Sequence, residues 1–168
     1  MRVIFLDIDG VLNSTEFAER HFAETGKGLF MYDFLDPDAV NRFKTFLEEN
    51  TDVKIVLSSS WRYGDYKHTI SDLEETWLKP ILPYVVGETI RSYERHRGKE
   101  IKHFLENVKN PKYNYLRKDG EDFTIESYVI VDDDRDMLEE QIPHFVNTDY
   151  NTGLVEEDYE KIKKILYA

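Results

Sequence analysis

Short apolar runs rich in β-branched residues alternate along the chain with segments of helical periodicity. The runs predict strands, and their alternation with helices is typical of a parallel α/β sheet. Five strands are expected, over residues 3–6, 53–57, about 81–86, 128–131 and 144–146. The sequence therefore predicts an α/β fold built on a mostly parallel sheet.

Helices are expected between and after these strands. Asp36 followed by Pro37 is an N-cap with proline at the first helical position, and it predicts a helix to about Glu49. Three more helices follow from apolar residues at helical spacing: residues 71–78, residues 98–108 and the C-terminal segment around 159–166.

Two segments interrupt the alternation. Residues 14–35 surround Gly26-Lys27-Gly28 with aromatic residues and predict a hairpin or flap, whose aromatics we interpret as a satellite core: Phe17, Phe22, Phe30 and Tyr32. Residues 110–127 contain Asp119-Gly120 and predict a second hairpin. Since no repeat or linker is present, residues 1–168 are expected to form one domain.

Composition excludes several classes of function. With 168 residues, 40% of them hydrophobic, the chain can bury a proper core. It has no cysteine, so disulfides, thiolate zinc sites and cysteine nucleophiles cannot contribute. No apolar stretch approaches the ~20 residues of a membrane span, and the first apolar run is too short for a signal peptide. We therefore expect a cytoplasmic protein without a membrane partner.

Charge narrows the choice of partners. A formal net charge of −12 argues against broad, sequence-independent binding of nucleic acid. One local exception exists over residues 91–103, where basic side chains outnumber acidic ones; they are Arg91, Arg95, Arg97, Lys99 and Lys102. An anion-binding role is favoured for this segment over a merely solvated helix start.

Acidic residues follow two of the predicted strands. Asp7 and Asp9 lie two residues apart in an extended segment, so their side chains share one side, and Gly10 lets the backbone turn away. A second cluster, residues 132–134, follows the strand at 128–131. Ligands of open α/β sheets gather at the carboxyl ends of strands, and oxygen-only ligand sets suit Mg²⁺. The two clusters therefore predict a magnesium site.

Other polar residues fall near the same expected edge. Ser58 follows the second strand and could donate to a phosphoryl oxygen, and Arg97 or Lys99 at a helix start could hold a phosphate. Candidate substrate contacts are Asn13, Trp61 and Arg62. A turn-forming role for Asn13 and packing of Trp61 beneath the site are equally good interpretations.

The order of these motifs resembles that of the haloacid dehalogenase (HAD) superfamily. Asp7-Ile8-Asp9-Gly10-Val11-Leu12 is similar to its first motif, Ser58 to its second, and Asp132-Asp133 to its fourth. For the third motif, Arg97-Gly98-Lys99-Glu100-Ile101 aligns Arg97 with the usual lysine, whereas a shift of two residues selects Lys99. Further segments resemble the small HAD domains of RNA-repair and phage-type proteins, among them Ser-Ser-Trp-Arg at 59–62 and Val-Asp-Asp-Asp at 131–134.

The resemblance implies a fold and a reaction. The fold is a three-layer sandwich around a sheet of order 3-2-1-4-5, without a large cap domain because the inserts are short. The reaction is Mg²⁺-dependent hydrolysis of a phosphomonoester through an aspartyl-phosphate. Asp7 is the implied nucleophile and Asp9 the general acid and base. The metal is expected at Asp7, the Asp9 carbonyl and Asp133, with Asp132 and Asp136 in supporting positions.

The resemblance also implies partners and leaves alternative functions. A small phosphorylated molecule or a nucleic-acid end is the expected substrate, and the chain is expected to be a monomer or a homodimer. A response-regulator receiver domain is disfavoured because its motifs occur in a different order. A non-catalytic HAD-like binding module and a phosphotransferase of the same fold remain alternatives.

Overall fold

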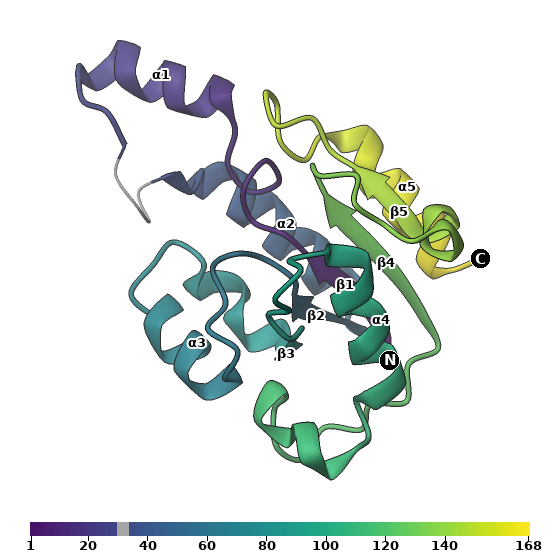
Figure 1. Ribbon diagram of the computed structural model, residues 1–168. Coiled ribbons are helices and arrows are strands. Elements are labelled where there is room, and N and C mark those ends of the chain that lie inside the picture. Colours follow the sequence, from purple (N-terminus) through teal and green to yellow (C-terminus); the bar gives the residue numbers. More distant parts are fainter. Residues whose placement is uncertain (30–33) are drawn as a thin grey trace.

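A sheet of five parallel strands forms the centre of the molecule (Figure 1). The computed structural model describes residues 1–29 and 34–168. The strands are β1 (Arg2–Leu6), β2 (Val53–Leu57), β3 (Val85–Glu88), β4 (Ser127–Asp132) and β5 (Phe145–Asn147). They lie in the order β3-β2-β1-β4-β5, with each neighbouring pair parallel, which confirms the expected fold class and strand order.

Five α-helices accompany the sheet in the described part of the chain. They are α1 (Thr15–Thr25), α2 (Pro37–Glu49), α3 (Tyr66–Leu73), α4 (Arg97–Asn107) and α5 (Glu156–Leu166). Short 3₁₀ helices cover Lys79–Tyr84, Pro111–Leu116 and Glu139–His144. None of the described helices has the length and apolar character needed to cross a bilayer.

The residues of β1 alternate between two hydrophobic layers, as the pleat of a strand requires. Ile4 and Leu6 pack in a core cluster shared with α2 and α5. Val3 and Phe5 point the other way, into a cluster shared with α4. The sheet is therefore the middle layer of a three-layer sandwich, and α4 covers the face on which Val3 and Phe5 lie.

Local capping explains where several elements begin. The Asp36 carboxylate accepts the Asp38 N–H at 2.9 Å, so α2 begins at Pro37 as predicted. The helix expected at 71–78 lies instead at Tyr66–Leu73, because Asp65 accepts the His68 N–H at 3.1 Å and caps it there. The third strand begins at Val85 rather than near residue 81, since the preceding segment forms a proline-containing 3₁₀ helix.

The hairpin predicted over residues 14–35 is wrong in its described part. The Ser14 hydroxyl accepts the Phe17 N–H at 3.1 Å and starts α1, which ends at left-handed Gly26. Figure 1 shows α1 standing away from the sheet, and Phe22 on it is 59% exposed. This helix therefore buries no satellite core. Phe30 and Tyr32 lie outside the described residues.

The second predicted hairpin, over residues 110–127, is also wrong. Its first part is a 3₁₀ helix, and Arg117 makes a single antiparallel bridge to Gly87 of β3. Phe123 is buried and packs edge-on against Phe104 of α4, with ring centroids 6.1 Å apart. Burial of Phe123 in the core, rather than pairing of two strands within the segment, is what holds this connection.

Candidate active site

The register of three strands brings the ends of β1, β2 and β4 to the same level. Leu6 pairs with Leu57 of β2 and with Val131 of β4. The next residues along these strands are Asp7, Ser58 and Asp132. Because side chains alternate sides, all three point to the face covered by α4. The backbone ladder continues through them, with the Asp7 N–H donating to Val131 at 3.0 Å and the Ser58 N–H donating to Leu6 at 2.8 Å.

Three carboxylates converge at this level. One oxygen from each of Asp7, Asp132 and Asp133 lies within 4.8 Å of the others. Burial raises the pKa of Asp7 to about 6 and that of Asp132 to about 8, and the neighbouring charge of Asp7 adds to the second shift. Burial also raises the pKa of Asp133. Such a group of buried carboxyls is stabilised by protons or by a cation among the oxygens.

The chemistry of the three carboxylates indicates which cation they could bind. All three groups are carboxylates, and one buried oxygen of Asp7 has no hydrogen-bond partner among the described residues. Hard divalent ions bind such oxygens, and Mg²⁺ needs only a few protein ligands. The residues present therefore fit Mg²⁺. The Asp9 carboxylate is not part of this converging set among the described residues, and the expected role of its backbone carbonyl stays a prediction.

Arg97, the first residue of α4, reaches into the acidic cluster. Its Nε donates to Asp132 at 3.0 Å, and its Nη2 lies 3.6 Å from Asp7. The positive charge of Arg97 opposes the upward pKa shifts of both carboxyls. Lys99 instead lies exposed and pairs with Glu94. Of the two candidate cations, the structure brings only Arg97 to the cluster.

Asp136 serves the helix end rather than the carboxylate group. Its side chain accepts the backbone N–H of Arg97 at 2.8 Å, and its carbonyl accepts the N–H of Gly98 at 3.1 Å. A negative charge at this position also complements the helix dipole. Asp136 therefore holds the start of α4 together with the N-cap residue His96, whose ring accepts the Lys99 N–H at 3.4 Å.

Two serines lie beside Asp7. Ser58 is 1% exposed, and its hydroxyl oxygen lies 3.4 Å from that of Thr89. Ser59 hydrogen-bonds to the Asp7 carboxyl, which lowers the pKa of that group. Sequence reasoning named Ser58 and missed Ser59, although both belong to the Ser58-Ser59-Ser60 run. The signal available in the sequence was that run itself, which offers several hydroxyls at one strand end.

Asp9 is held at the mouth of the site by two neighbours. The Trp61 indole donates to one carboxylate oxygen at 2.8 Å, and the Asn13 amide donates to the other at 2.8 Å. Asn13 also accepts the Gly10 N–H at 2.7 Å, so its turn-forming interpretation is confirmed. Trp61 packs partly against the main core, as the alternative interpretation expected. Both residues thus orient Asp9.

Gly10 is required by the close packing of the first turn. Its φ of 69° lies in the left-handed region, and a Cβ there would meet the Asp133 carboxyl carbon at 2.5 Å. The absence of a side chain at residue 10 therefore leaves the space that Asp133 occupies beside Asp7.

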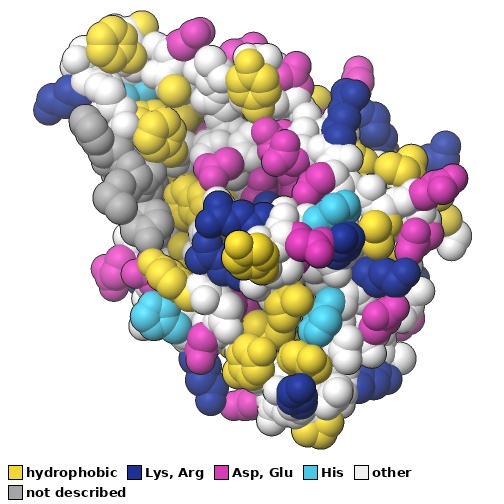
Figure 2. Space-filling model, in the orientation of Figure 1, with side chains coloured by type: hydrophobic (Ala, Val, Ile, Leu, Met, Phe, Trp, Pro, Cys, Tyr) yellow, Lys and Arg dark blue, Asp and Glu magenta, His cyan; other side chains and the backbone are white. Residues whose placement is uncertain are grey.

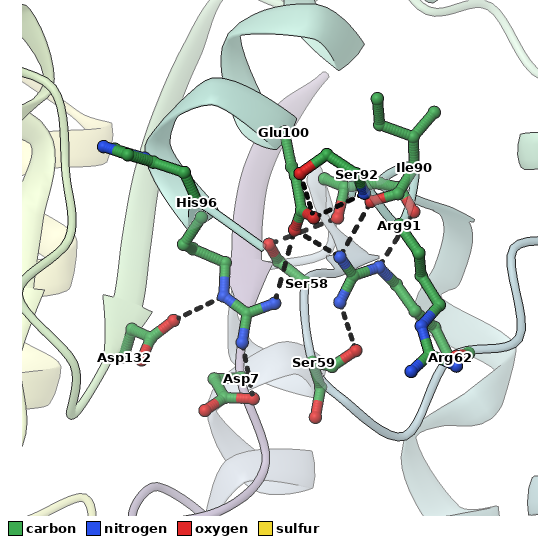
Figure 3. Close-up of polar contacts among 12 residues, drawn as sticks. Asp7, Ser58, Ser59, Arg62, Ile90, Arg91, Ser92, His96, Glu100 and Asp132 are labelled. Carbon is green, nitrogen blue, oxygen red and sulfur yellow. Dashed lines mark hydrogen bonds and ion pairs between the residues drawn. The ribbon is translucent and has the colours of Figure 1, made fainter. Parts of the chain in front are cut away.

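The prediction that Arg62 contacts substrate needs correction. Its side chain is 3% exposed, and its guanidinium donates to three backbone carbonyls and to the buried Glu100 carboxylate (Figure 3); the carbonyls belong to Ser59, Thr89 and Ile90. Burial lowers the pKa of Arg62 to about 10, so it stays charged at neutral pH. Arg62 therefore joins the loops after β2 and β3 to α4 and supports the site from beneath.

Comparison with known proteins adds one finding. A family model described as a HAD domain in Swiss Army Knife RNA repair proteins matches residues 3–159. No curated protein and no solved structure matches the chain significantly.

Proposed function

Because the chain belongs to the family of HAD domains in Swiss Army Knife RNA repair proteins, we propose that it is a Mg²⁺-dependent phosphomonoesterase working through an aspartyl-phosphate. One observation carries the proposal. Asp7, Asp132 and Asp133 converge at the ends of two adjacent strands, with the cation of Arg97 beside them. In the proposal, the nucleophile, the metal ligands and the anion-binding group thus lie together at one edge of the sheet.

In the proposed reaction the Asp7 carboxylate attacks phosphorus. A bond forms between its oxygen and phosphorus while the bond to the leaving oxygen breaks, and Asp9 gives that oxygen a proton. Water then attacks the aspartyl-phosphate, and Asp9 takes the proton that the water loses. Inorganic phosphate leaves, and the Asp7 carboxylate is restored.

The remaining residues bind and orient. Arg97 and Ser58 are proposed to stabilise the phosphoryl oxygens on which charge develops. Asp7, Asp132, Asp133 and the carbonyl of Asp9 are proposed to hold Mg²⁺, which would neutralise charge between nucleophile and phosphate. Lys99 has no part in this proposal, because its ammonium pairs with Glu94 on the surface.

The proposed substrate is a nucleotide or the terminal phosphate of a nucleic acid. The family description, which refers to RNA repair proteins, supports this class. The absence of a large cap domain among the described helices supports it as well, since a bulky substrate would meet no separate covering domain.

Hydrolysis of p-nitrophenyl phosphate tests the proposal. The wild-type protein should release p-nitrophenol with Mg²⁺ and stop when EDTA is added. Asp7→Asn should lose about 10³-fold or more of this rate while melting as the wild type does, since it removes the nucleophile. Asp119→Asn changes charge equally at a 75% exposed side chain paired with Lys67, and it should keep the rate.

The possible results separate the alternatives. An Asp7→Asn variant with near-normal activity would remove Asp7 as nucleophile. A folded wild-type protein that binds Mg²⁺ and hydrolyses none of a panel of phosphomonoesters would be a binding module. Transfer of the phosphoryl group to an added alcohol in preference to water would identify a phosphotransferase.

A further inference from the structure

A cavity of about 630 Å³ adjoins the acidic cluster and has no role in the reaction described above. Arg97 forms part of its wall, and the same guanidinium contacts Asp7 and Asp132. Arg91, Tyr93 and Arg95 line it as well. The cavity therefore extends from Arg97, which contacts the acidic cluster, along the loop that connects β3 to α4.

Arg91 and Arg95 are the cations on this loop that the protein itself does not neutralise. Neither forms an ion pair with any described residue, and Arg91 donates only to the Arg62 carbonyl, at 3.2 Å. Neighbouring cations that do not line the cavity are paired: Lys99 with Glu94, and Lys102 with Glu140. In a chain of net charge −12, two arginines without an ion pair among the described residues, on the wall of one cavity, indicate a binding site for an anion.

The surface supports this view. Figure 2 shows Lys and Arg side chains gathered beside acidic side chains in the middle of one face. Tyr93 lies between the two arginines in sequence and is 102% exposed, so it packs against nothing in the protein. Exposed aromatic rings next to arginines provide a face on which a base can stack. Three acidic side chains, Glu100, Asp134 and Asp136, also line the cavity. Glu100 is already paired with Arg62, and Asp136 accepts the backbone N–H of Arg97 at the start of α4.

We propose that Arg91 and Arg95 form a second phosphate subsite, so that the preferred substrate carries another phosphate besides the one removed. This inference rests on the proposed phosphatase function and narrows its substrate. The reacting phosphoryl group already has Arg97 and Ser58, which leaves the two arginines for a different anion. A cavity of about 630 Å³ is large enough for a nucleoside with its additional phosphate. That phosphate belongs either to a nucleoside bisphosphate or to the backbone of an oligonucleotide.

Phosphate release from matched substrates tests the subsite. Adenosine 3′,5′-bisphosphate is compared with adenosine 3′- and 5′-monophosphate, and the dinucleotide ApA bearing a 3′- or 5′-terminal phosphate is measured in parallel. Wild-type kcat/KM should be about tenfold higher for substrates with two phosphates, as expected for two charge-assisted contacts in water. The preference should weaken with added salt, because the contacts are ionic.

Arg91→Gln/Arg95→Gln should bring the ratio of the two kcat/KM values close to one. Lys99→Gln removes the same kind of charge from the same segment at a residue paired with Glu94, and it should keep the wild-type ratio. The kcat/KM of adenosine 3′,5′-bisphosphate and that of phosphorylated ApA are each divided by the kcat/KM of the monophosphate. The substrate with the larger quotient identifies the source of the second phosphate.

The outcomes distinguish this inference from the function on which it rests. Equal kcat/KM for one- and two-phosphate substrates in an active wild-type enzyme overturns the subsite and leaves the phosphatase intact. If no substrate, including p-nitrophenyl phosphate, is hydrolysed, the phosphatase proposal fails. Calorimetric binding of adenosine 3′,5′-bisphosphate then decides the subsite: it stands if the double variant loses affinity and Lys99→Gln does not, and falls if all three proteins bind alike.

Discussion

Removing Mg²⁺ should make the stability of this protein fall as the pH rises from about 4 to about 8. The pKa of buried Asp7 is raised from 3.8 to about 6, and that of Asp132 from 3.8 to about 8. In the unfolded chain both groups lose their protons near pH 4. Above that pH the metal-free folded state therefore binds more protons than the unfolded state, so its free energy of unfolding decreases with pH.

The size of the effect follows from the number of protons. Each proton held by the folded state alone lowers the free energy of unfolding by about 1.4 kcal/mol per pH unit. Between about pH 6 and pH 8, Asp7 has lost its proton and Asp132 retains one, so the loss should be on the order of 3 kcal/mol. In the proposed site Mg²⁺ would take the place of protons among the carboxylates, so a saturating concentration should remove this contribution.

Urea denaturation at pH 6, 7 and 8, with EDTA or with Mg²⁺, measures the effect. Groups outside the acidic cluster contribute equally to both proteins, so the decisive quantity is the difference in slope between the wild type and Asp132→Asn. This variant should lose the excess slope in EDTA and its response to Mg²⁺. Asp119→Asn, at a surface carboxylate, should behave as the wild type.

Two results would refute the reasoning. The first is an equal slope for wild type and Asp132→Asn in EDTA, which would mean that the buried pair holds no excess proton. The second is a wild-type slope that Mg²⁺ leaves unchanged, which would mean that the ion does not bind among these carboxylates.

Three further predictions concern neighbouring residues. Asp9→Asn should lower turnover of alkyl phosphates by about 10²–10⁴-fold, with a smaller loss on p-nitrophenyl phosphate, whose leaving group needs no proton; equal losses on both would contradict its role as general acid. Gly10→Ala should raise the Mg²⁺ concentration needed for half-maximal activity, because its Cβ would displace Asp133, and an unchanged Mg²⁺ titration would show that the turn yields instead. Arg62→Met should lower the free energy of unfolding by about 3 kcal/mol, since it removes the closest cation from buried Glu100 and leaves only the Arg97 guanidinium, at 3.8 Å, to compensate its charge. Arg62→Met/Glu100→Leu should recover part of the loss in urea denaturation, and a double variant no more stable than Arg62→Met would contradict this account.

The sequence was sufficient for the fold class and for the acidic part of the site. A parallel sheet places the carboxyl ends of its strands at one edge, so acidic residues directly after apolar runs are expected to meet. Asp7 and Asp132 follow such runs, and they do lie close together. The Asp36-Pro37 cap similarly determined the start of α2, because its signal is contained within a few adjacent residues.

Local glycine and aromatic patterns did not predict the structure of the two connecting segments correctly. Around residues 14–35 the glycines and aromatics were read as a hairpin, yet Ser14 and Gly26 supply the local hydrogen bonds that begin and end a helix. In the second segment, Phe123 packs against Phe104 of α4, which lies outside the segment. Strand pairing depends on such distant partners, which short-range patterns do not contain.

The choice between Arg97 and Lys99 was decided only by tertiary structure. Residues two apart on a helix point in nearly opposite directions, since each step turns about 100°. Only one of the two could face Asp7, and it is Arg97, whose backbone N–H is held by Asp136 from the next connection. The role of Arg62 was likewise decided only by tertiary structure, because its burial depends on Glu100 and on carbonyls of another loop. The sequence thus determined which chemical groups meet at the sheet edge, while long-range packing decided which cation reaches them and which one supports the site from within.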